Sequence, residues 1–255
     1  MWDRGALKYH AREVLKRSYW KAFVASLLLT LVTGGGQVVR NFSATKQASE
    51  GSLHGVGGFG VMGEHLMTAL LFVLPVILVV LFLSGVVGIA IGLFVCAPLE
   101  VGAQRFFLES TQSRFQLGEL GYAFDCGGYR NIVLTMFLRG LYTFLWSLLF
   151  LIPGLVKHYS YRMVPFLLVE NPKMLPSRAI ELSGQMTQGH KWSMFVLDLS
   201  FFGWYILGAL ALGIGVFFVH PYVYATQAQL YLALRGAALE QGMTSLDELM
   251  PPRNA

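Results

Sequence analysis

The sequence predicts an all-α fold: a polytopic transmembrane helix bundle of about six spans, preceded by an amphipathic helix at the membrane interface. Of its 255 residues, 55% are hydrophobic and only 13% are charged, and the mean hydropathy is +0.56. Soluble domains carry about 25% charged residues, so this chain has too little polar material to cover a water-facing surface. Most of the surface is therefore expected to face lipid, and the bilayer is the first predicted partner.

The net charge of +5 does not indicate a nucleic-acid partner. Lys and Arg lie at the ends of apolar runs and do not form one basic patch with interleaved aromatic residues. This placement is typical of residues that orient a membrane protein.

Residues 1–20 are expected to form the amphipathic interfacial helix. Leu7, Ala11, Val14 and Leu15 share one helical face. Such a helix is held in the headgroup region by apolar burial and by about 1 kcal/mol of attraction to anionic lipid per basic residue. The basic residues around the other faces are Arg4, Lys8, Arg12, Lys16 and Arg17. The alternative is an ordinary solvated start of a helix.

Residues 21–236 are predicted to form one transmembrane domain, followed by a polar C-terminal tail over 237–255. A Gly-rich external loop is expected over 40–65. The apolar runs place the spans at 22–39, 66–98, 131–152, 155–170, 193–213 and 216–235.

The second run, 66–98, is too long for one perpendicular crossing. As a helix it measures about 50 Å, against about 30 Å for the hydrocarbon core. It must tilt, kink at Pro75, project beyond the bilayer or break near Ser84. Within it Ser84, Gly88 and Gly92 recur every four residues, a spacing that lets two helix backbones approach closely. The alternative is that glycine is merely common in membrane helices.

Three prolines are expected to break helices: Pro98, Pro153 and Pro221. Two of them lie in similar segments, GLFVCAPLEVGAQRFFL and GVFFVHPYVYATQAQLYL. Aligning Pro98 with Pro221 also aligns Gln104 with Gln227. This similarity predicts duplicated halves, each with a proline-broken helix. The alternative is that low-complexity apolar segments align easily.

The distribution of basic residues predicts a cytoplasmic N-terminus in a bacterial plasma membrane. With six spans, the inside segments carry most of the Lys and Arg, and the outside keeps chiefly Arg40, Lys46 and Lys157. The alternative is a four-span layout in which residues 154–192 lie partly in the interface and outside.

Charged residues within apolar runs are the candidate intramembrane polar cluster. Arg139, Arg162 and Asp198 should face the bundle interior, because a lone charge in hydrocarbon costs about 2.5–3.5 kcal/mol or more. We expect Asp198 to pair with Arg139 or Arg162, either as a strut between helices or as part of a proton relay or ligand anchor. Tyrosines that could line this cluster are Tyr142, Tyr159, Tyr161, Tyr222 and Tyr224.

The sequence contains no catalytic constellation, so no enzyme, cofactor or metal site is predicted. The six histidines are scattered, with no H-E-x-x-H pair, no G-x-S-x-G elbow and no phosphate-binding lysine after a glycine loop. Cys96 lies in an apolar run and Cys126 in a polar connector, so no disulfide is expected.

Several segments together resemble the bacterial integral membrane proteins grouped as domain of unknown function 975. They are RGALKYHAREVLKRSYWKAFVASLLL, PLEVGAQRFFLE, FLIPGLVKHYSYRMVPFLLVENP, AIELSGQMTQGHKWSMFVLDLSFFGWYILG and HPYVYATQAQLYLAL. The resemblance covers nearly the whole chain and implies a plasma-membrane location. The chain is also distantly similar to membrane domains attached to some glycerophosphodiester phosphodiesterases, which implies a module that escorts lipid-linked or exported material.

Three functions remain open at this point. The first is a non-catalytic membrane component that binds another membrane protein or forms a homo-oligomer. The second is a carrier or permease for a small molecule or a lipid-linked substrate. The third is an intramembrane enzyme. A polar cavity would favour the carrier, whereas an exposed groove of small residues would favour the protein partner.

Overall fold

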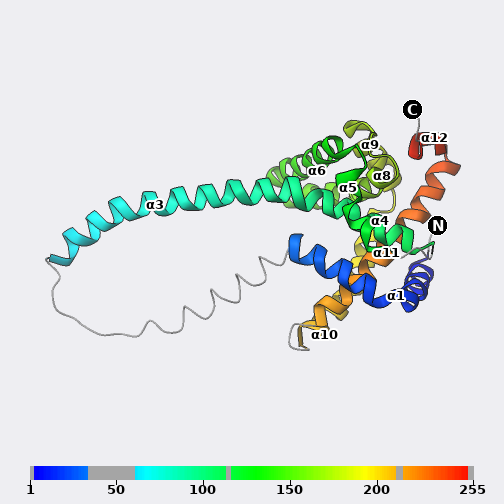
Figure 1. The fold of residues 1–255 in the computed structure, drawn as a ribbon, viewed down its shortest axis with the longest axis horizontal. Helices are drawn as coiled ribbons and strands as arrows, with labels where there is room; N and C mark the ends of the chain where they lie inside the picture. Colours follow the sequence, from blue (N-terminus) through cyan, green and yellow to red (C-terminus); the bar gives the residue numbers. More distant parts are fainter. Residues whose placement is uncertain (1–2, 34–60, 113–115, 211–214, 252–255) are drawn as a thin grey trace.

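The computed structural model describes residues 3–33, 61–112, 116–210 and 215–251, and every regular element in these ranges is a helix (Figure 1). This confirms the predicted all-α class. In chain order the elements are α1 (Arg4–Thr33), α3 (Val61–Ile91), the π-helical turn η1 (Gly92–Cys96), α4 (Ala97–Ser110), the 3-10 helix η2 (Leu117–Gly121), α5 (Tyr122–Asp125), α6 (Tyr129–Leu149), α7 (Leu151–Ser160), α8 (Val164–Glu170), α9 (Pro176–Met186), α10 (Lys191–Leu210), α11 (Gly215–Glu240) and α12 (Leu246–Leu249).

Two described stretches, Leu74–Ser110 and Tyr129–Leu149, are long and apolar enough to cross a membrane. Six spans were predicted, and by length and apolar composition the described residues support two of them. Most of the predicted 40–65 loop lies outside the described residues, and α3 begins within it at Val61.

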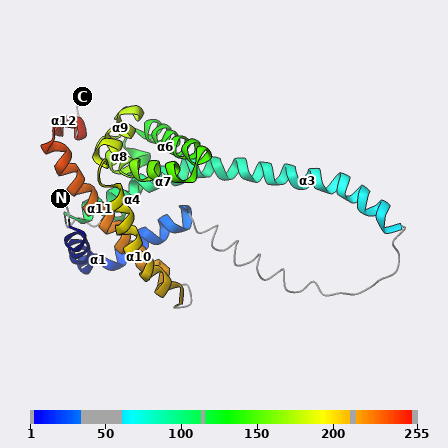
Figure 2. The ribbon, with the colours of Figure 1, turned by 180° about the vertical axis from the view of Figure 1, so that it is seen from behind.

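Helix α1 joins the predicted interfacial helix and the first span into one continuous element, which changes direction along its length (Figures 1 and 2). The expected lipid contact of its apolar face is wrong. Leu7, Ala11 and Leu15 are buried in the protein core, because α1 packs against α4 and α11. The amphipathic pattern identified the buried face correctly but not what covers it.

The core lies where α4, α8 and α11 pack together. Phe106 on α4 is fully buried, and Phe166 on α8 stacks on Tyr231 of α11 with ring centroids 4.9 Å apart. Close backbone approach helps to form this core, since a Cβ on Gly102 of α4 would lie 2.8 Å from the carbonyl carbon of Leu120. Only glycine fits there without a shift of the backbone.

Helices α3, η1 and α4 form one uninterrupted helical stretch, so of the four alternatives for the long apolar run the structure excludes a break near Ser84 (Figure 1). The break expected at Pro98 is also wrong. The π-helical turn η1 precedes this proline, and the Tyr129 hydroxyl donates to the Phe94 carbonyl at 2.7 Å. Proline cannot donate to the carbonyl four residues before it, so an extra residue in the turn and an outside donor keep the helix continuous.

The run predicted as one span over 155–170 is instead two short helices, α7 and α8, separated by a turn. The preceding break lies at Phe150, whose backbone is extended (φ −158°, ψ 148°). Pro153 explains this position, because its ring excludes a helical carbonyl four residues earlier, at Leu149. Helix α7 then folds back along α6, and a Cβ on Gly154 would lie 2.6 Å from the Cα of Ser147.

Helix α11 runs through Pro221, so the third expected break is also wrong. The Tyr19 hydroxyl of α1 donates to the Phe218 carbonyl at 3.2 Å, one turn before the proline. The two prolines differ in detail, because Tyr129 donates to the carbonyl four residues before Pro98, whereas Tyr19 donates to the carbonyl three residues before Pro221.

The predicted C-terminal tail is folded against the body as far as it is described. Its first residues extend α11 to Glu240, and Leu249 of α12 is fully buried. Glu248 accepts hydrogen bonds from Arg178 of α9 at 2.7 Å and 3.1 Å, and its backbone carbonyl accepts one from Asn171. These contacts tie the C-terminal segment to the connector between α8 and α10.

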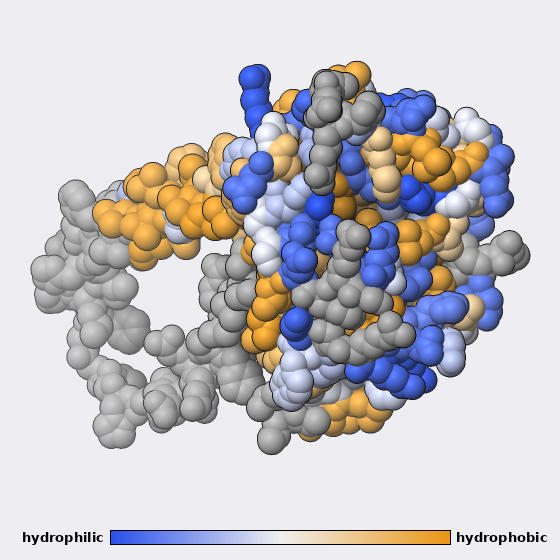
Figure 3. Space-filling view, turned by 45° about the vertical axis from the view of Figure 1, so that its right-hand side comes forward, coloured by the Kyte–Doolittle hydropathy of each residue, from blue (hydrophilic) through white to orange (hydrophobic). Residues whose placement is uncertain are grey.

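Exposed apolar side chains gather at the end of the molecule away from the two termini. Helix α3 leaves the body there as a long apolar arm, and Figure 3 shows it beside a body face with many hydrophilic residues. The last parts of α6 and α10 and the start of α7 contribute further exposed apolar residues. The molecule therefore has an apolar end and a polar end.

Candidate functional site

A polar cavity of about 280 Å³ lies where α4, α6, α7 and α11 meet. Two members of the predicted cluster, Arg139 and Arg162, line it, and Asp198 of α10 contacts Arg162. The full lining is Glu100, Gln104, Arg139, His158, Arg162, Tyr224 and Gln227. The cavity is thus lined by polar side chains from four different helices and one turn.

Arg162 and Asp198 form a bidentate ion pair, which confirms the second of the two predicted pairings. The guanidinium donates from Nη1 to Oδ2 at 2.7 Å and from Nη2 to Oδ1 at 2.9 Å. The Tyr159 hydroxyl also donates to Oδ2, at 3.0 Å, and the guanidinium lies 5.5 Å from the centre of the Tyr159 ring. Both side chains are largely buried, with 13% of Arg162 and 32% of Asp198 exposed. Parallel N–H···O bonds of this kind fix geometry as well as charge.

Arg139 pairs with Glu100 and not with Asp198. Its Nη1 donates to Glu100 Oε1 at 2.9 Å, which joins the two stretches that are long and apolar enough to span a membrane. Arg139 is the middle residue of α6 and lies where this helix changes from buried, at Met136, to exposed, at Leu141. The cavity therefore lies at the junction between the polar and apolar ends of the molecule.

Two glutamines complete the polar lining. Gln104 is 5% exposed, and within the described residues its Oε1 has no hydrogen-bond partner. A buried amide without a partner costs about 1–3 kcal/mol, so this oxygen is available to a ligand or water that donates to it. Gln227 lines the same cavity from α11. The similarity of the two proline-containing segments had aligned these two glutamines.

An apolar groove of about 760 Å³ continues from the cavity toward the apolar end. It shares Glu100, Arg139 and His158 with the cavity and then follows α6 and the end of α3. Gly92 and Gly140 line it, and a Cβ at either would meet nothing within 4 Å. The groove therefore has open space beside both glycines.

The predicted tyrosines do not lie together. Tyr159 bonds to Asp198 and Tyr224 lines the cavity, whereas Tyr161 is buried at the end of α7 beyond the cavity lining. Tyr142 is 40% exposed on the outer side of α6. Tyr222 lies in a different hollow, between α1, α10 and α11. The prediction of one tyrosine lining is thus wrong for three of its five members.

The small-residue stripe of α3 and η1 has no partner within the described chain. Ser84 and Gly88 lie in the exposed arm, and a Cβ on Gly88 would meet nothing within 4 Å. Gly92 instead lines the apolar groove. The prediction that this stripe packs against another helix is therefore not met inside the described part of the molecule.

Sequence reasoning missed Glu100 and His158. Glu100 falls in the connector that follows the predicted 66–98 span, although α4 carries it into the cavity. Cys96 and Cys126 are not joined in a disulfide, and the described residues contain no group of three or more His, Cys, Asp or Glu that could hold a metal ion.

In the part of the chain that the structure describes, the fold and site define a helical protein with two helical stretches long and apolar enough to span a membrane and a polar cavity between them. Comparison with protein families adds the particular group. Residues 63–238 match the family described as "Protein of unknown function (DUF975)", and the chain belongs to this family. No curated protein and no solved structure matches significantly.

Proposed function

We propose that the protein is a polytopic plasma-membrane carrier that binds an amphiphile, with the polar headgroup in the cavity and the apolar chain in the groove. The continuity of the two spaces supports this proposal, since they share Glu100, Arg139 and His158. A polar pocket opening into an apolar groove matches a lipid or lipid-linked molecule better than a fully polar solute.

The charges of the cavity favour a headgroup without net charge. Arg139 is paired with Glu100 and Arg162 with Asp198, so the guanidinium groups are already neutralised. The polar groups left for recognition are chiefly the amides of Gln104 and Gln227. A zwitterionic or polyhydroxylated headgroup can use such amides and the outer edges of the ion pairs. The proposed role is binding and movement of the ligand, without catalysis.

The membrane layout proposed with this function has six crossings and a cytoplasmic N-terminus. The two described termini lie at the same end of the molecule, opposite the far end of α3 (Figures 1 and 2). In this layout α7 and α8 together make the fourth crossing, and α10 and α11 make the last two. A crossing built from two short helices needs surrounding helices to satisfy its backbone groups.

The test is the set of lipids that copurify with the full-length protein in mild detergent, identified by native mass spectrometry. Gly140→Leu should fill the groove without disturbing neighbouring backbone, because a Cβ there meets nothing within 4 Å. We expect this variant to lose the bound amphiphile. Gly85→Leu is the matched control, because Gly85 is an equally open helical glycine outside the groove.

Retention of the same amphiphile by Gly140→Leu would overturn the groove assignment. A second variant, Gln104→Leu, addresses the headgroup. It should change which lipid class is retained, because it replaces the buried unpaired amide with an apolar group of similar size. Unchanged lipid selection in this variant would argue against the cavity as the headgroup site.

A second candidate function is a membrane component that binds another membrane protein or a second copy of itself. The observation in its favour is the α3 arm, on which every residue from Leu74 to Ile91 is exposed. Crosslinking from Gly88→Cys in native membranes tests it. A discrete crosslinked protein would favour this function, and reaction with lipid alone would favour the carrier.

A further inference from the structure

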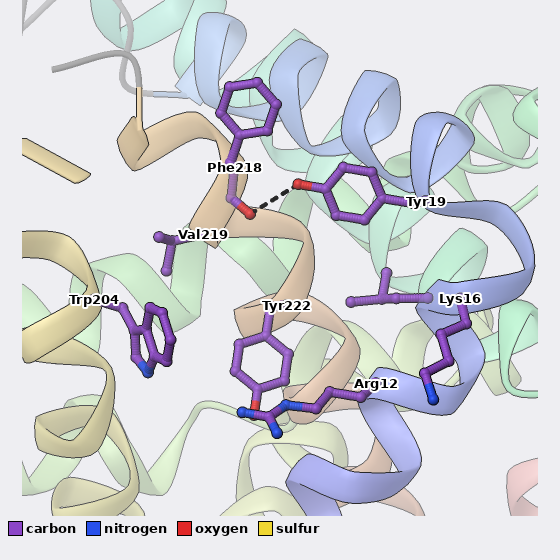
Figure 4. A pocket seen from close by; sticks show the side chains of 8 residues that line it. Arg12, Lys16, Tyr19, Trp204, Phe218, Val219 and Tyr222 are labelled. Carbon is purple, nitrogen blue, oxygen red and sulfur yellow. Dashed lines mark hydrogen bonds between the residues drawn. The ribbon is translucent and has the colours of Figure 1, made fainter. Parts of the chain in front are cut away.

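A second hollow, of about 390 Å³, lies between α1, α10 and α11, away from the polar cavity (Figure 4). Its wall is almost entirely apolar and aromatic and includes Trp204, Phe218 and Tyr222. Two basic residues of α1, Arg12 and Lys16, lie at its edge. None of the residues that line it carries a carboxylate, so the hollow joins an apolar wall to a positive rim.

The wall is held in shape by contacts between α1 and α11. The Tyr19 hydroxyl donates to the Phe218 carbonyl at 3.2 Å, and Phe23 stacks on Phe218 with ring centroids 4.9 Å apart. The exposed Trp204 faces the hollow from α10 (Figure 4). Tryptophan and tyrosine favour the boundary between headgroups and hydrocarbon, which is where a lipid site of this composition belongs.

The rim is part of a basic stripe in which Arg4, Lys8, Arg12 and Lys16 recur every four residues on α1. Lys8 donates to Ser200 Oγ at 2.6 Å, and burial together with the neighbouring charges of Arg12 and Arg4 lowers its pKa. Arg12 lies 5.5 Å from the centre of the Tyr222 ring. Within the described residues, no ion pair joins Arg12 or Lys16 to a carboxylate. A bound anion would relieve the repulsion along this stripe.

We propose that this hollow is a binding site for an anionic phospholipid, whose phosphate contacts Arg12 and Lys16 while an acyl chain covers the aromatic wall. The unbalanced positive charge selects this lipid class, in contrast to the neutralised cavity between α4 and α6. The site is independent of the proposed carrier function. It would fix α1 against the α10–α11 hairpin at the membrane surface.

The experiment measures binding of phosphatidylglycerol and phosphatidylcholine to the full-length protein in detergent by native mass spectrometry. The double variant Arg12→Gln/Lys16→Gln should bind phosphatidylglycerol about 25-fold more weakly, since each basic residue near a membrane surface contributes about fivefold. Binding of phosphatidylcholine should not change. Arg130→Gln/Lys173→Gln is the matched control, because it removes the same charge away from the hollow.

The acyl chain is tested separately by Val219→Phe, which adds volume to the apolar wall and leaves the charges in place. We expect phosphatidylglycerol binding to fall in this variant and to persist in Gly140→Leu, which alters the other groove. Equal binding of the two lipids by the wild-type protein would overturn the proposal. An equal loss of phosphatidylglycerol in the Arg130→Gln/Lys173→Gln control would also overturn it, because it would indicate general charge attraction.

Discussion

Replacing Asp198 with leucine is expected to destabilise the protein by about 2–3 kcal/mol. Breaking a buried ion pair from one side costs about 3–5 kcal/mol, and the loss expected here lies at or just below the lower end of that range because 32% of Asp198 is exposed. The variant leaves the Arg162 guanidinium 13% exposed without its carboxylate, and it removes the acceptor of the Tyr159 hydroxyl. For a chain of this size, such a loss corresponds to a fall in melting temperature of about 4–12 °C.

The double variant Arg162→Met/Asp198→Leu shows whether the stability loss of Asp198→Leu comes from the unpaired charge of Arg162 or from lost packing. Replacing both partners by apolar residues is often neutral, so we expect a melting temperature much closer to wild type than that of the single variant. The assay is thermal unfolding of full-length protein in mild detergent, with Asp125→Leu as an exposed control. If the double variant melts as low as Asp198→Leu, the reasoning fails, because the loss would then not come from an uncompensated charge.

Two further predictions concern packing and acid sensitivity. Gly102→Ala should lose about 1–3 kcal/mol, because its Cβ would meet the Leu120 carbonyl, whereas Gly118→Ala meets nothing within 4 Å and should unfold like wild type in the same thermal assay. Hydrogen bonding from Arg178 lowers the pKa of Glu248 in the folded state, so its stabilising effect is full above the ordinary value of 4.5 and is lost as pH falls through the lowered pKa. The measurement is hydrogen exchange of residues 244–250, corrected for intrinsic rates. The exchange rate should rise on acidification in the wild-type protein, whereas in Glu248→Gln acidification should not raise it. A wild-type exchange rate that does not change with pH would contradict this prediction.

The helices themselves could be predicted from local sequence, but their ends and partners could not. Apolar runs and helical periodicity identified the positions of α1, α3, α6, α10 and α11, because both depend only on neighbouring residues. Proline effects were misjudged because proline acts on the carbonyl four residues before it, so Pro153 ends α6 at Leu149. At Pro98 the freed carbonyl of Phe94 accepts from Tyr129, a donor from a distant part of the chain that no local pattern reveals.

Part of the candidate site could be predicted, because the free-energy cost of a lone charge in hydrocarbon requires that charge to form an ion pair. Charges within apolar runs need partners, which is why Asp198 could be expected to meet an arginine. Arg139 also needed a carboxylate, but Glu100 had been assigned to a connector, since the extension of α3 through η1 into α4 depends on tertiary packing. The similarity of the proline-containing segments was the one signal for Gln104 and Gln227. Both glutamines line the same cavity.

The proposed six-crossing layout makes a last prediction, about the connector that contains α9. Arg178 in this connector is ion-paired with Glu248 near the C-terminus, so the connector and the C-terminal segment must share one side of the membrane. The four-span alternative puts the connector outside and the C-terminus inside, which this ion pair does not permit. With Cys96 and Cys126 replaced by serine, Ser177→Cys should react with an impermeant maleimide only after cells are permeabilised. Reaction in intact cells would place the connector outside and would overturn the six-crossing layout.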